Sequence, residues 1–439
     1  MNQTALTPGT AKAFHIETFG CTANVGDTLI MRTILKTAGH KIVEARKADI
    51  VIVDTCTVTK RTELNVLKRI KELKEQGKEV VVAGCMAAAQ PELVKSFLGE
   101  DVTMITPRDI YNGYSEEQER ELDFDGVIAV IPIAMGCVGR CTYCIVKQAR
   151  GDLRSYAADK LCKAVKSAVD RGAKEIRITA QDCSAYGWDG FSINYPKLPE
   201  LLERLTAVEG DFRIRVGMMN PFTVIRILDE LLDAFESEKI FNFFHVPVQS
   251  GSDKVLGDMR RNYKAADFDA IVKTIRKQFK YSTISTDFIV GFPSETEEDF
   301  WSSLNLLKTV KPEKVNITRF SSRPGTEASK QKDLVEREKK RRSRIFSDAY
   351  HRLAFAKNKE LVGKELSVLV TEMGKKGGVI GRDASYRTVV IKSDLPLGST
   401  FKVRVKEAKS TYLVGEVQIT INKPRDSTRL TQEMTVSGG

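Results

Sequence analysis

The chain has 439 residues, of which 42% are hydrophobic and 29% are charged, and its formal net charge is +11 at pH 7. This composition excludes a disordered protein, and the length is sufficient for two or three domains that each have a core. The sequence contains no apolar run close to the roughly 20 residues that cross a bilayer, and its polar first residues lack a signal-peptide core. We therefore expect a cytoplasmic protein that does not interact with membranes.

The excess positive charge lies in the last quarter of the sequence. Residues 330–439 contain 24 Lys and Arg against 13 Asp and Glu, whereas residues 1–329 contain 45 of each class. A basic segment attached to a neutral body is typical of a protein that binds nucleic acid, although a well-solvated basic face has the same composition. In a reducing compartment, the eight cysteines favour metal or catalytic use over disulfides.

Three apolar runs alternate with helical segments in the first hundred residues, at 13–20, 49–55 and 79–84. This alternation predicts a parallel sheet that is covered on both faces. A cysteine follows each run: Cys21, Cys56 and Cys85. Because ligand sites form beyond the carboxyl ends of parallel strands, we expect the three cysteines to converge there. The alternative is three buried cysteines that act as small hydrophobic residues.

From about residue 126 the alternation continues with a longer period. Six further apolar runs occur at 127–134, 175–180, 212–218, 241–248, 283–290 and 315–320, with helical stretches such as 157–170, 265–280 and 295–308 between them. Six strand-helix units predict a barrel or partial barrel whose functional loops follow the strands.

The pattern of the sequence changes in the last hundred residues. A long polar helix is predicted from about residue 334 to 359, followed by alternating runs at 365–374, 386–393, 400–407 and 412–421 that predict a small antiparallel β-barrel. The fold class is therefore α/β, with an N-terminal parallel sheet domain (residues 1–120), a central (β/α)6 partial barrel (121–360), a C-terminal barrel (361–424) and a tail (425–439).

Cys137, Cys141 and Cys144 follow the first strand of the expected barrel. A structural zinc site prefers four ligands, and this loop has no fourth cysteine or histidine nearby. In a [4Fe-4S] cluster each iron takes one thiolate, so three thiolates leave one iron free to bind a ligand that is not protein. The spacing favours such a cluster over a zinc site or a purely structural cluster.

The spacing Cys-x3-Cys-x2-Cys, with Tyr143 before the last cysteine, resembles the signature of the radical S-adenosylmethionine enzymes. The resemblance implies a TIM-type partial barrel in which the open iron binds the amino and carboxylate groups of S-adenosylmethionine. Electron transfer from the cluster then cleaves the sulfonium and produces a 5′-deoxyadenosyl radical.

Longer motifs resemble the methylthiotransferases within that family, at residues 18–27, 54–63, 81–92, 245–263, 285–300 and 321–329. The C-terminal runs resemble the TRAM domain, a small RNA-binding barrel. The resemblance implies two [4Fe-4S] clusters, the second of which is held by Cys21, Cys56 and Cys85. It also implies contacts with the cofactor or substrate from Tyr143, Gln181, Asp182, Gln249, Ser250 and Gly291. An ordinary polar loop residue is the alternative for each of these six.

The resemblance implies replacement of a carbon-hydrogen bond by a methylthio group. Residues 144–156, 215–221 and 260–268 resemble the archaeal and eukaryotic branch, which acts on N6-threonylcarbamoyladenosine in the anticodon loop of tRNA. The alternatives are isopentenyladenosine in tRNA, an aspartate of a ribosomal protein, or a non-enzymatic iron-sulfur protein that binds RNA. The expected partners are tRNA, an electron donor protein and a sulfur donor, and we expect a monomer.

A basic run in the long helix is a candidate contact for tRNA phosphates, although a solvated helix face is an equal alternative. The run consists of Lys339, Lys340, Arg341 and Arg342.

Overall fold

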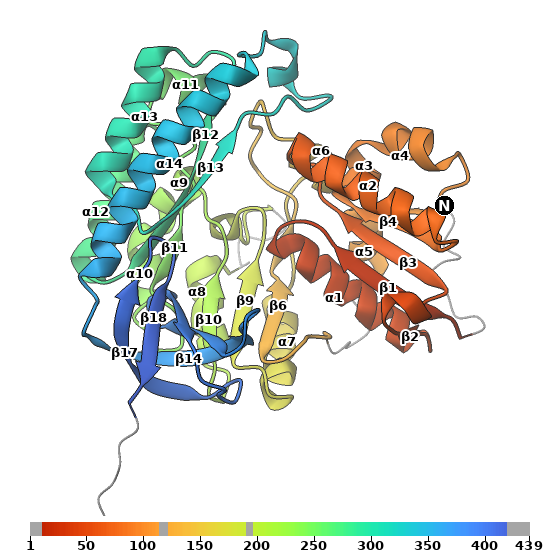
Figure 1. Cartoon of the computed structure of the whole chain (residues 1–439), viewed down its shortest axis with the longest axis horizontal. Helices are drawn as coiled ribbons and strands as arrows, with labels where there is room; N and C mark the ends of the chain where they lie inside the picture. Colours follow the sequence, from red (N-terminus) through yellow and green to blue (C-terminus); the bar gives the residue numbers. More distant parts are fainter. Residues whose placement is uncertain (1–10, 114–121, 190–195, 419–439) are drawn as a thin grey trace, which may run out of the picture.

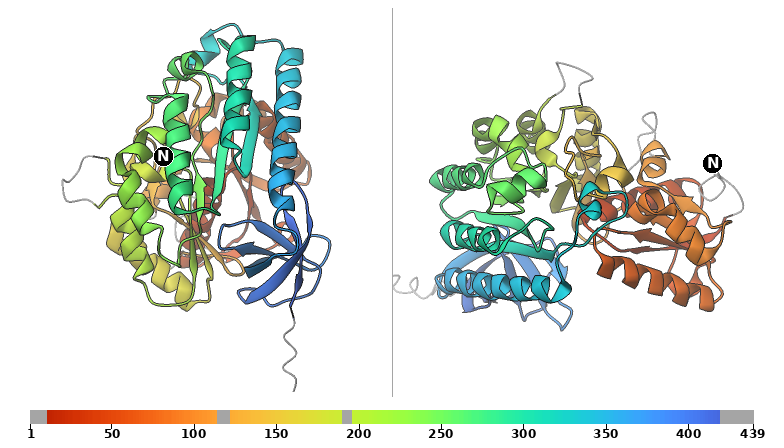
Figure 2. Two further views of the ribbon diagram at one scale, coloured as in Figure 1. Left: turned by 90° about the vertical axis from the view of Figure 1, so that its left-hand side faces the viewer. Right: turned by 90° about the horizontal axis from the view of Figure 1, so that it is seen from above.

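The computed structural model describes residues 11–113, 122–189 and 196–418 (Figure 1). The N-terminal domain lies beside the central barrel, and the C-terminal barrel lies at one end of it (Figures 1 and 2). Within the described residues, no helix is long and apolar enough to cross a membrane. The predicted tail at 425–439 and the predicted boundaries near residues 120 and 424 lie outside the described ranges.

The N-terminal domain is a five-stranded parallel sheet with the order β2-β1-β3-β4-β5. Its central strand β3 is buried at every position because helices cover both faces. The strands are β1 (Ala13–Thr18), β2 (Lys41–Ile42), β3 (Ile50–Thr55), β4 (Glu79–Gly84) and β5 (Met104–Ile105), and the helices are α1 (Thr22–Thr37), α2 (Lys60–Glu75), α3 (Cys85–Ala89), α4 (Pro91–Leu98) and α5 (Pro107–Gly113). The predicted parallel sheet is confirmed.

The central domain contains the six predicted parallel strands in two three-stranded sheets. Parallel bridges from Ile214 to Ile240 and from Met218 to His245 connect the two sheets into a partial barrel. The strands are β6 (Ile128–Pro132), β9 (Glu175–Thr179), β10 (Arg213–Val216), β11 (Phe243–His245), β12 (Thr283–Val290) and β13 (Lys314–Arg319). A short antiparallel pair, β7 (Ala134–Met135) and β8 (Arg154–Ser155), flanks the loop after the first strand.

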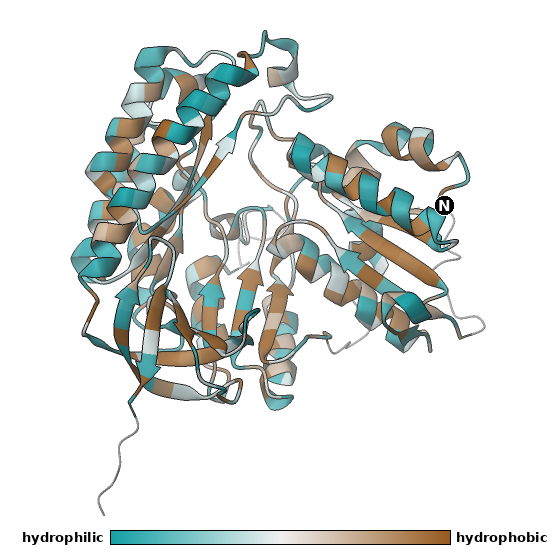
Figure 3. Cartoon of the chain, in the orientation of Figure 1, coloured by the Kyte–Doolittle hydropathy of each residue, from teal (hydrophilic) through white to brown (hydrophobic). Residues whose placement is uncertain are grey.

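Helices cover the outside of this barrel, and their polar faces point away from the hydrophobic strands (Figure 3). The longer helices are α7 (Ala158–Asp170), α8 (Leu198–Thr206), α10 (Leu228–Ala234), α12 (Ala265–Gln278), α13 (Glu297–Val310) and α14 (Glu336–Lys359). Three shorter helices follow strands: α6 (Val146–Arg150), α9 (Pro221–Val224) and α11 (Asp253–Asp258). The core is continuous across the first two domains, since Phe14, Ile34 and Ile131 belong to one buried cluster.

The C-terminal domain is a closed five-stranded barrel with the order β14-β15-β16-β18-β17. Its strands are β14 (Glu365–Met373), β15 (Val379–Asp383), β16 (Thr388–Ile391), β17 (Thr400–Ala408) and β18 (Leu413–Val417). Two details differ from the prediction: β15, a short strand after two glycines, was not anticipated, and the β16–β18 pair is parallel. One pair must be parallel because the other four neighbouring pairs are antiparallel, and a closed barrel with an odd number of strands cannot alternate throughout.

The C-terminal barrel packs against the end of the central barrel at which strands begin. The Tyr386 hydroxyl donates to Glu175, the first residue of β9, at 2.5 Å, and Tyr386 packs with Phe241, Phe243 and Leu369. The Nζ of Lys314, the first residue of β13, donates to the Tyr386 carbonyl at 3.2 Å. This end of the barrel is thereby occupied, which leaves the opposite end, where the strands terminate, for a functional site.

Candidate functional site

The loop that carries Cys137, Cys141 and Cys144 lies between β7 and α6, at the carboxyl end of the barrel strands. Gly136 has a φ of +78°, and a Cβ added there would lie 2.0 Å from the Asp152 carbonyl oxygen. Only glycine fits both restrictions, so the loop needs this residue in order to turn back before the first cysteine.

Hydrogen-bond donors face the sulfur atoms of this loop. The Gly139 N–H donates to Cys137 Sγ at 3.2 Å, and Arg261 Nη1 donates to Cys141 Sγ at 3.4 Å. Burial raises the pKa of Cys137 to about 12, so the thiol stays protonated at neutral pH unless a metal displaces the proton. Donors directed at sulfur stabilise thiolates, and the loop therefore fits a cluster bound by three thiolates.

The cysteines of this loop do not gather around one point. Among the residues that the structure describes, no three His, Cys, Asp or Glu side chains lie close enough to hold a single metal ion. In a [4Fe-4S] cluster each cysteine binds a different iron, so its sulfur ligands stand farther apart than those around a single zinc ion.

Arg261 is a site residue that the sequence analysis did not single out. Its guanidinium contacts Cys141 and also donates to Asn220 Oδ1 at 3.1 Å, to the Pro247 carbonyl at 3.3 Å and to the Tyr263 hydroxyl at 2.8 Å. These partners fix the charge beside the cysteine loop. The pair of arginines in the motif at 260–263 was visible in the sequence, but nothing there showed which of the two turns inward.

Gln181 and Asp182 follow β9 but differ in what they face. Gln181 Oε1 accepts from the Gly136 N–H at 2.8 Å, which ties it to the cysteine loop. Asp182 is buried, and its carboxylate accepts from Ser184 at 2.6 Å and from Thr223 at 2.9 Å. Gln181 therefore lies beside the loop, whereas Asp182 joins a closed polar cluster behind it.

Gln249 and Ser250 also differ in exposure and in what surrounds them. Gln249 is partly exposed in a left-handed conformation with a φ of 69°, and its backbone pairs with β12. Ser250 is fully buried, and its hydroxyl lies 3.2 Å from the hydroxyl of Ser303 on α13. The Ser250 side chain thus faces α13 in this structure, and its contact with cofactor or substrate stays a prediction.

Tyr143 lies near Gly291 because its ring packs against Phe292, the residue that follows Gly291. The Tyr143 ring packs edge-on against Phe292 at 6.4 Å between centroids. Gly291 has a φ of +74°, and a Cβ added there would lie 2.4 Å from Lys339 Cγ. Gly291 therefore lies close to Lys339 of α14, and its predicted contact with the cofactor stays a prediction.

The N-terminal cysteines converge at the carboxyl edge of their sheet, as expected. Cys21 is the N-cap residue of α1, Cys56 follows β3, and Cys85 is the first residue of α3. Burial, with smaller contributions from the neighbouring Cys56 and Cys21, raises the pKa of Cys85 to about 12. The three thiols are therefore near enough to interact, and their role as cluster ligands stays a prediction.

A buried ion pair joins the two cysteine-bearing regions. Arg150, in the last turn of α6 after the cysteine loop, pairs with Asp27 of α1, which follows Cys21. A cavity beside this pair is lined by residues of both domains, among them Tyr156 and Gln181. The edge of the N-terminal sheet thus faces the open end of the barrel.

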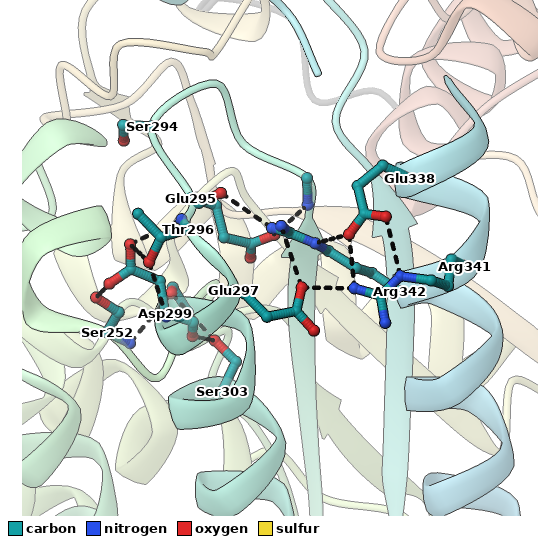
Figure 4. A network of polar contacts seen from close by, with 12 residues as sticks. Ser252, Ser294, Glu295, Thr296, Glu297, Asp299, Ser303, Glu338, Arg341 and Arg342 are labelled. Carbon is teal, nitrogen blue, oxygen red and sulfur yellow. Dashed lines mark hydrogen bonds and ion pairs between the residues drawn. The ribbon is translucent and has the colours of Figure 1, made fainter. Parts of the chain in front are cut away.

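Most side chains of the basic run in α14 form ion pairs. Lys339 and Arg342 are only 5% and 4% exposed. Arg342 Nη1 lies 2.6 Å from Glu295, and Arg341 bonds Glu297 and Glu338 (Figure 4). Lys339 and Arg342 are buried and engaged in ion pairs in this structure, and their contacts with tRNA phosphates stay a prediction. Lys340 is exposed and has no ion pair among the described residues.

Comparison with known families and proteins agrees with this arrangement. Family models match at residues 131–307 (radical SAM superfamily), 13–105 (the uncharacterized protein family UPF0004) and 359–418 (TRAM domain). A protein of Archaeoglobus fulgidus named probable threonylcarbamoyladenosine tRNA methylthiotransferase is 40% identical over 420 residues, 92% of this chain and 98% of that protein. The chain belongs to the threonylcarbamoyladenosine tRNA methylthiotransferase family.

Other members of this family come from animals. The Drosophila pseudoobscura pseudoobscura protein of that name is 32% identical over 98% of this chain and 82% of its own length. Among solved structures, the radical S-adenosylmethionine methyltransferase TsrM of Kitasatospora setae has a TM-score of 0.52 at 13% identity, covering 82% of this chain and 81% of that one. The latter shows the fold alone. The radical SAM match implies S-adenosylmethionine and a [4Fe-4S] cluster, which the Cys137 loop fits.

Proposed function

We propose that the chain is a tRNA methylthiotransferase that converts N6-threonylcarbamoyladenosine in the anticodon loop to its 2-methylthio derivative. The observation that supports this most strongly is the pairing of two separate three-cysteine sets across one domain boundary, at Arg150 and Asp27. The names of the archaeal and animal relatives supply the substrate.

The two cysteine sets have different roles in this proposal. Cys137, Cys141 and Cys144 hold the cluster that binds S-adenosylmethionine, and Arg261 stabilises the thiolate of Cys141. With S-adenosylmethionine bound, this cluster supplies a 5′-deoxyadenosyl radical that removes a hydrogen atom from the substrate carbon. Gln181 orients the loop through the Gly136 N–H.

The second role belongs to the N-terminal domain. Cys21, Cys56 and Cys85 would hold a second [4Fe-4S] cluster, which would supply the sulfur chemistry of the transfer. Asn24 supports this set, since its Oδ1 accepts from the Cys21 N–H at 3.4 Å and its Nδ2 donates to Asp54 at 3.0 Å. An aromatic carbon-hydrogen bond has no acidic proton, so acid-base residues alone do not suffice for this chemistry.

The basic C-terminal region supports an RNA substrate. The TRAM match covers residues 359–418, and the excess of Lys and Arg begins at residue 330. Positive charge of this kind neutralises tRNA phosphates. The protein works in the cytoplasm as a monomer, with an electron donor protein and a sulfur donor as its further partners.

Nucleoside analysis of tRNA from cells that lack the gene tests this proposal. We expect loss of the 2-methylthio nucleoside and retention of N6-threonylcarbamoyladenosine. An unchanged nucleoside profile contradicts it. Loss of the methylthio form of isopentenyladenosine, or of a modified ribosomal-protein aspartate, assigns the same chemistry to another substrate.

A further inference from the structure

Residues 321–330 connect β13 to α14 and lie between the barrel and the N-terminal domain (Figure 2); we call this segment the strap. It contacts the cysteine loop directly. The Ala328 N–H donates to the carbonyl of Thr142, between Cys141 and Cys144, at 2.9 Å. A Cβ added to Gly325 would lie 2.9 Å from the Gln148 amide of α6, so the strap packs closely against the end of the loop.

The same strap reaches the N-terminal domain through Arg323. Arg323 forms an ion pair with Glu63 of α2, and the two side chains are 3% and 1% exposed. Arg323 Nη2 also donates to the Thr57 hydroxyl at 3.0 Å. Thr57 directly follows Cys56. Arg323 of the strap therefore binds the segment that carries a cysteine of the N-terminal set.

Glu63 is held by more than this one contact. Gln90 Nε2 donates to it at 2.8 Å and Lys60 Nζ at 2.5 Å, and Gln90 also bonds Thr57. The acceptor that Arg323 engages is therefore fixed within the N-terminal domain. The strap thus binds a fixed acceptor, Glu63, in the N-terminal domain. It also binds the cysteine loop through the Ala328 N–H, so it acts as a spacer between the two cysteine sets.

We infer that Arg323 is a positioning residue that sets the separation between the two cysteine sets. The inference rests on the proposed function, in which sulfur held at one set must meet the carbon activated beside the other. A displacement of about 1 Å between reacting groups lowers rates by on the order of 100-fold. Radical formation would need the cluster held by the cysteine loop, S-adenosylmethionine and one electron from the reductant, but not the second cysteine set, so it does not depend on this separation.

The test uses the full-length reconstituted protein with Arg323→Gln, the conservative Arg323→Lys, and Arg319→Gln as a matched control. Arg319 pairs with Glu336 inside the same domain and makes no contact with the N-terminal domain among those described. We expect Arg323→Gln to produce 5′-deoxyadenosine like the wild type, while methylthio product per cleavage falls by on the order of 100-fold. Arg323→Lys restores part of the product, and Arg319→Gln matches the wild type.

Hydrogen exchange of the same proteins without tRNA gives a second readout. We expect faster exchange in residues 57–63 and 321–330 of Arg323→Gln, and no change in β3 or β4. Parallel loss of cleavage and product overturns the positioning role, because it indicates damage to the cysteine loop itself. Unchanged product and unchanged exchange overturn it as well. Failure of the proposed function differs from both outcomes, since the wild type itself then yields no methylthio product.

Discussion

Arg150 of the barrel and Asp27 of the N-terminal domain form an ion pair whose side chains are only 4% and 9% exposed. Arg150 lies six residues after Cys144, and Asp27 lies six residues after Cys21. The pair therefore joins the two cysteine-bearing segments at the same number of residues after a cysteine in each. A buried pair of this kind fixes orientation, but it makes each partner dependent on the other.

Replacement of Arg150 by Met is expected to destabilise the protein. Burial raises the pKa of Asp27 and Arg150 opposes that rise, so loss of the arginine leaves a buried carboxyl without its partner. We expect a loss of about 3–5 kcal/mol in unfolding free energy, measured by denaturant titration. The control Asp170→Asn breaks an exposed pair with Lys166 and changes stability by less than about 1 kcal/mol. Equal midpoints for the two variants contradict the account.

Substitution of a cysteine in one set is expected to affect a different product from substitution in the other set. Cys141→Ala removes a ligand of the first cluster and abolishes formation of 5′-deoxyadenosine. Cys56→Ala leaves that cleavage intact and stops formation of the methylthio nucleoside, with iron content falling by about half. Simultaneous assay of both products and of iron separates the cases. Loss of cleavage in Cys56→Ala shows that the proposed division between the sets is incorrect.

Lys314 is expected to make stability depend on pH at the junction with the C-terminal barrel. Burial, followed by the charges of Arg382 and Arg215, lowers its pKa from 10.5 to about 7. Between these values the unfolded chain binds more protons than the folded chain, so this lysine makes unfolding free energy rise with pH. Below about pH 7 its contribution is constant. Denaturation midpoints of the wild type should therefore rise relative to Lys314→Met across that window, and a constant difference contradicts this assignment.

The basic run of α14 is expected to divide into structural and exposed members. Arg342→Ala lowers unfolding free energy by about 3–5 kcal/mol because it leaves the buried Glu295 unpaired. Lys340→Ala leaves stability unchanged, and if Lys340 contacts a phosphate, the salt dependence of tRNA binding falls by about one unit of slope. Affinity measured at several salt concentrations decides whether Lys340 belongs to the tRNA interface.

The sequence predicted the strands and the convergence of cysteines because both follow from local patterns. Val and Ile runs ending in Cys56 and Cys85 place those residues at one sheet edge whatever the details of packing. The pattern could not show which polar loop residues turn inward. Ser250 is buried whereas its neighbour Gln249 is partly exposed, and the packing of α13 against Ser250 makes this difference.

Local sequence patterns also could not predict which charged side chains pair with residues far away in the sequence. Four consecutive basic residues at 339–342 are typical of a solvated helix face, but three of them pair with carboxylates outside α14. The contacts of Arg261, Arg150 and Arg323 each join segments more than 100 residues apart. Such partners depend on the assembled domains and leave no periodic signal in the sequence.

The central claim is that two cysteine sets act together on a base in tRNA. The most direct measurement is mass spectrometry of nucleosides after anaerobic reaction of the reconstituted full-length protein with S-adenosylmethionine, a reductant, a sulfide source and tRNA that carries N6-threonylcarbamoyladenosine. The account predicts conversion of that nucleoside to its 2-methylthio form together with 5′-deoxyadenosine. Formation of 5′-deoxyadenosine with an unaltered nucleoside contradicts it.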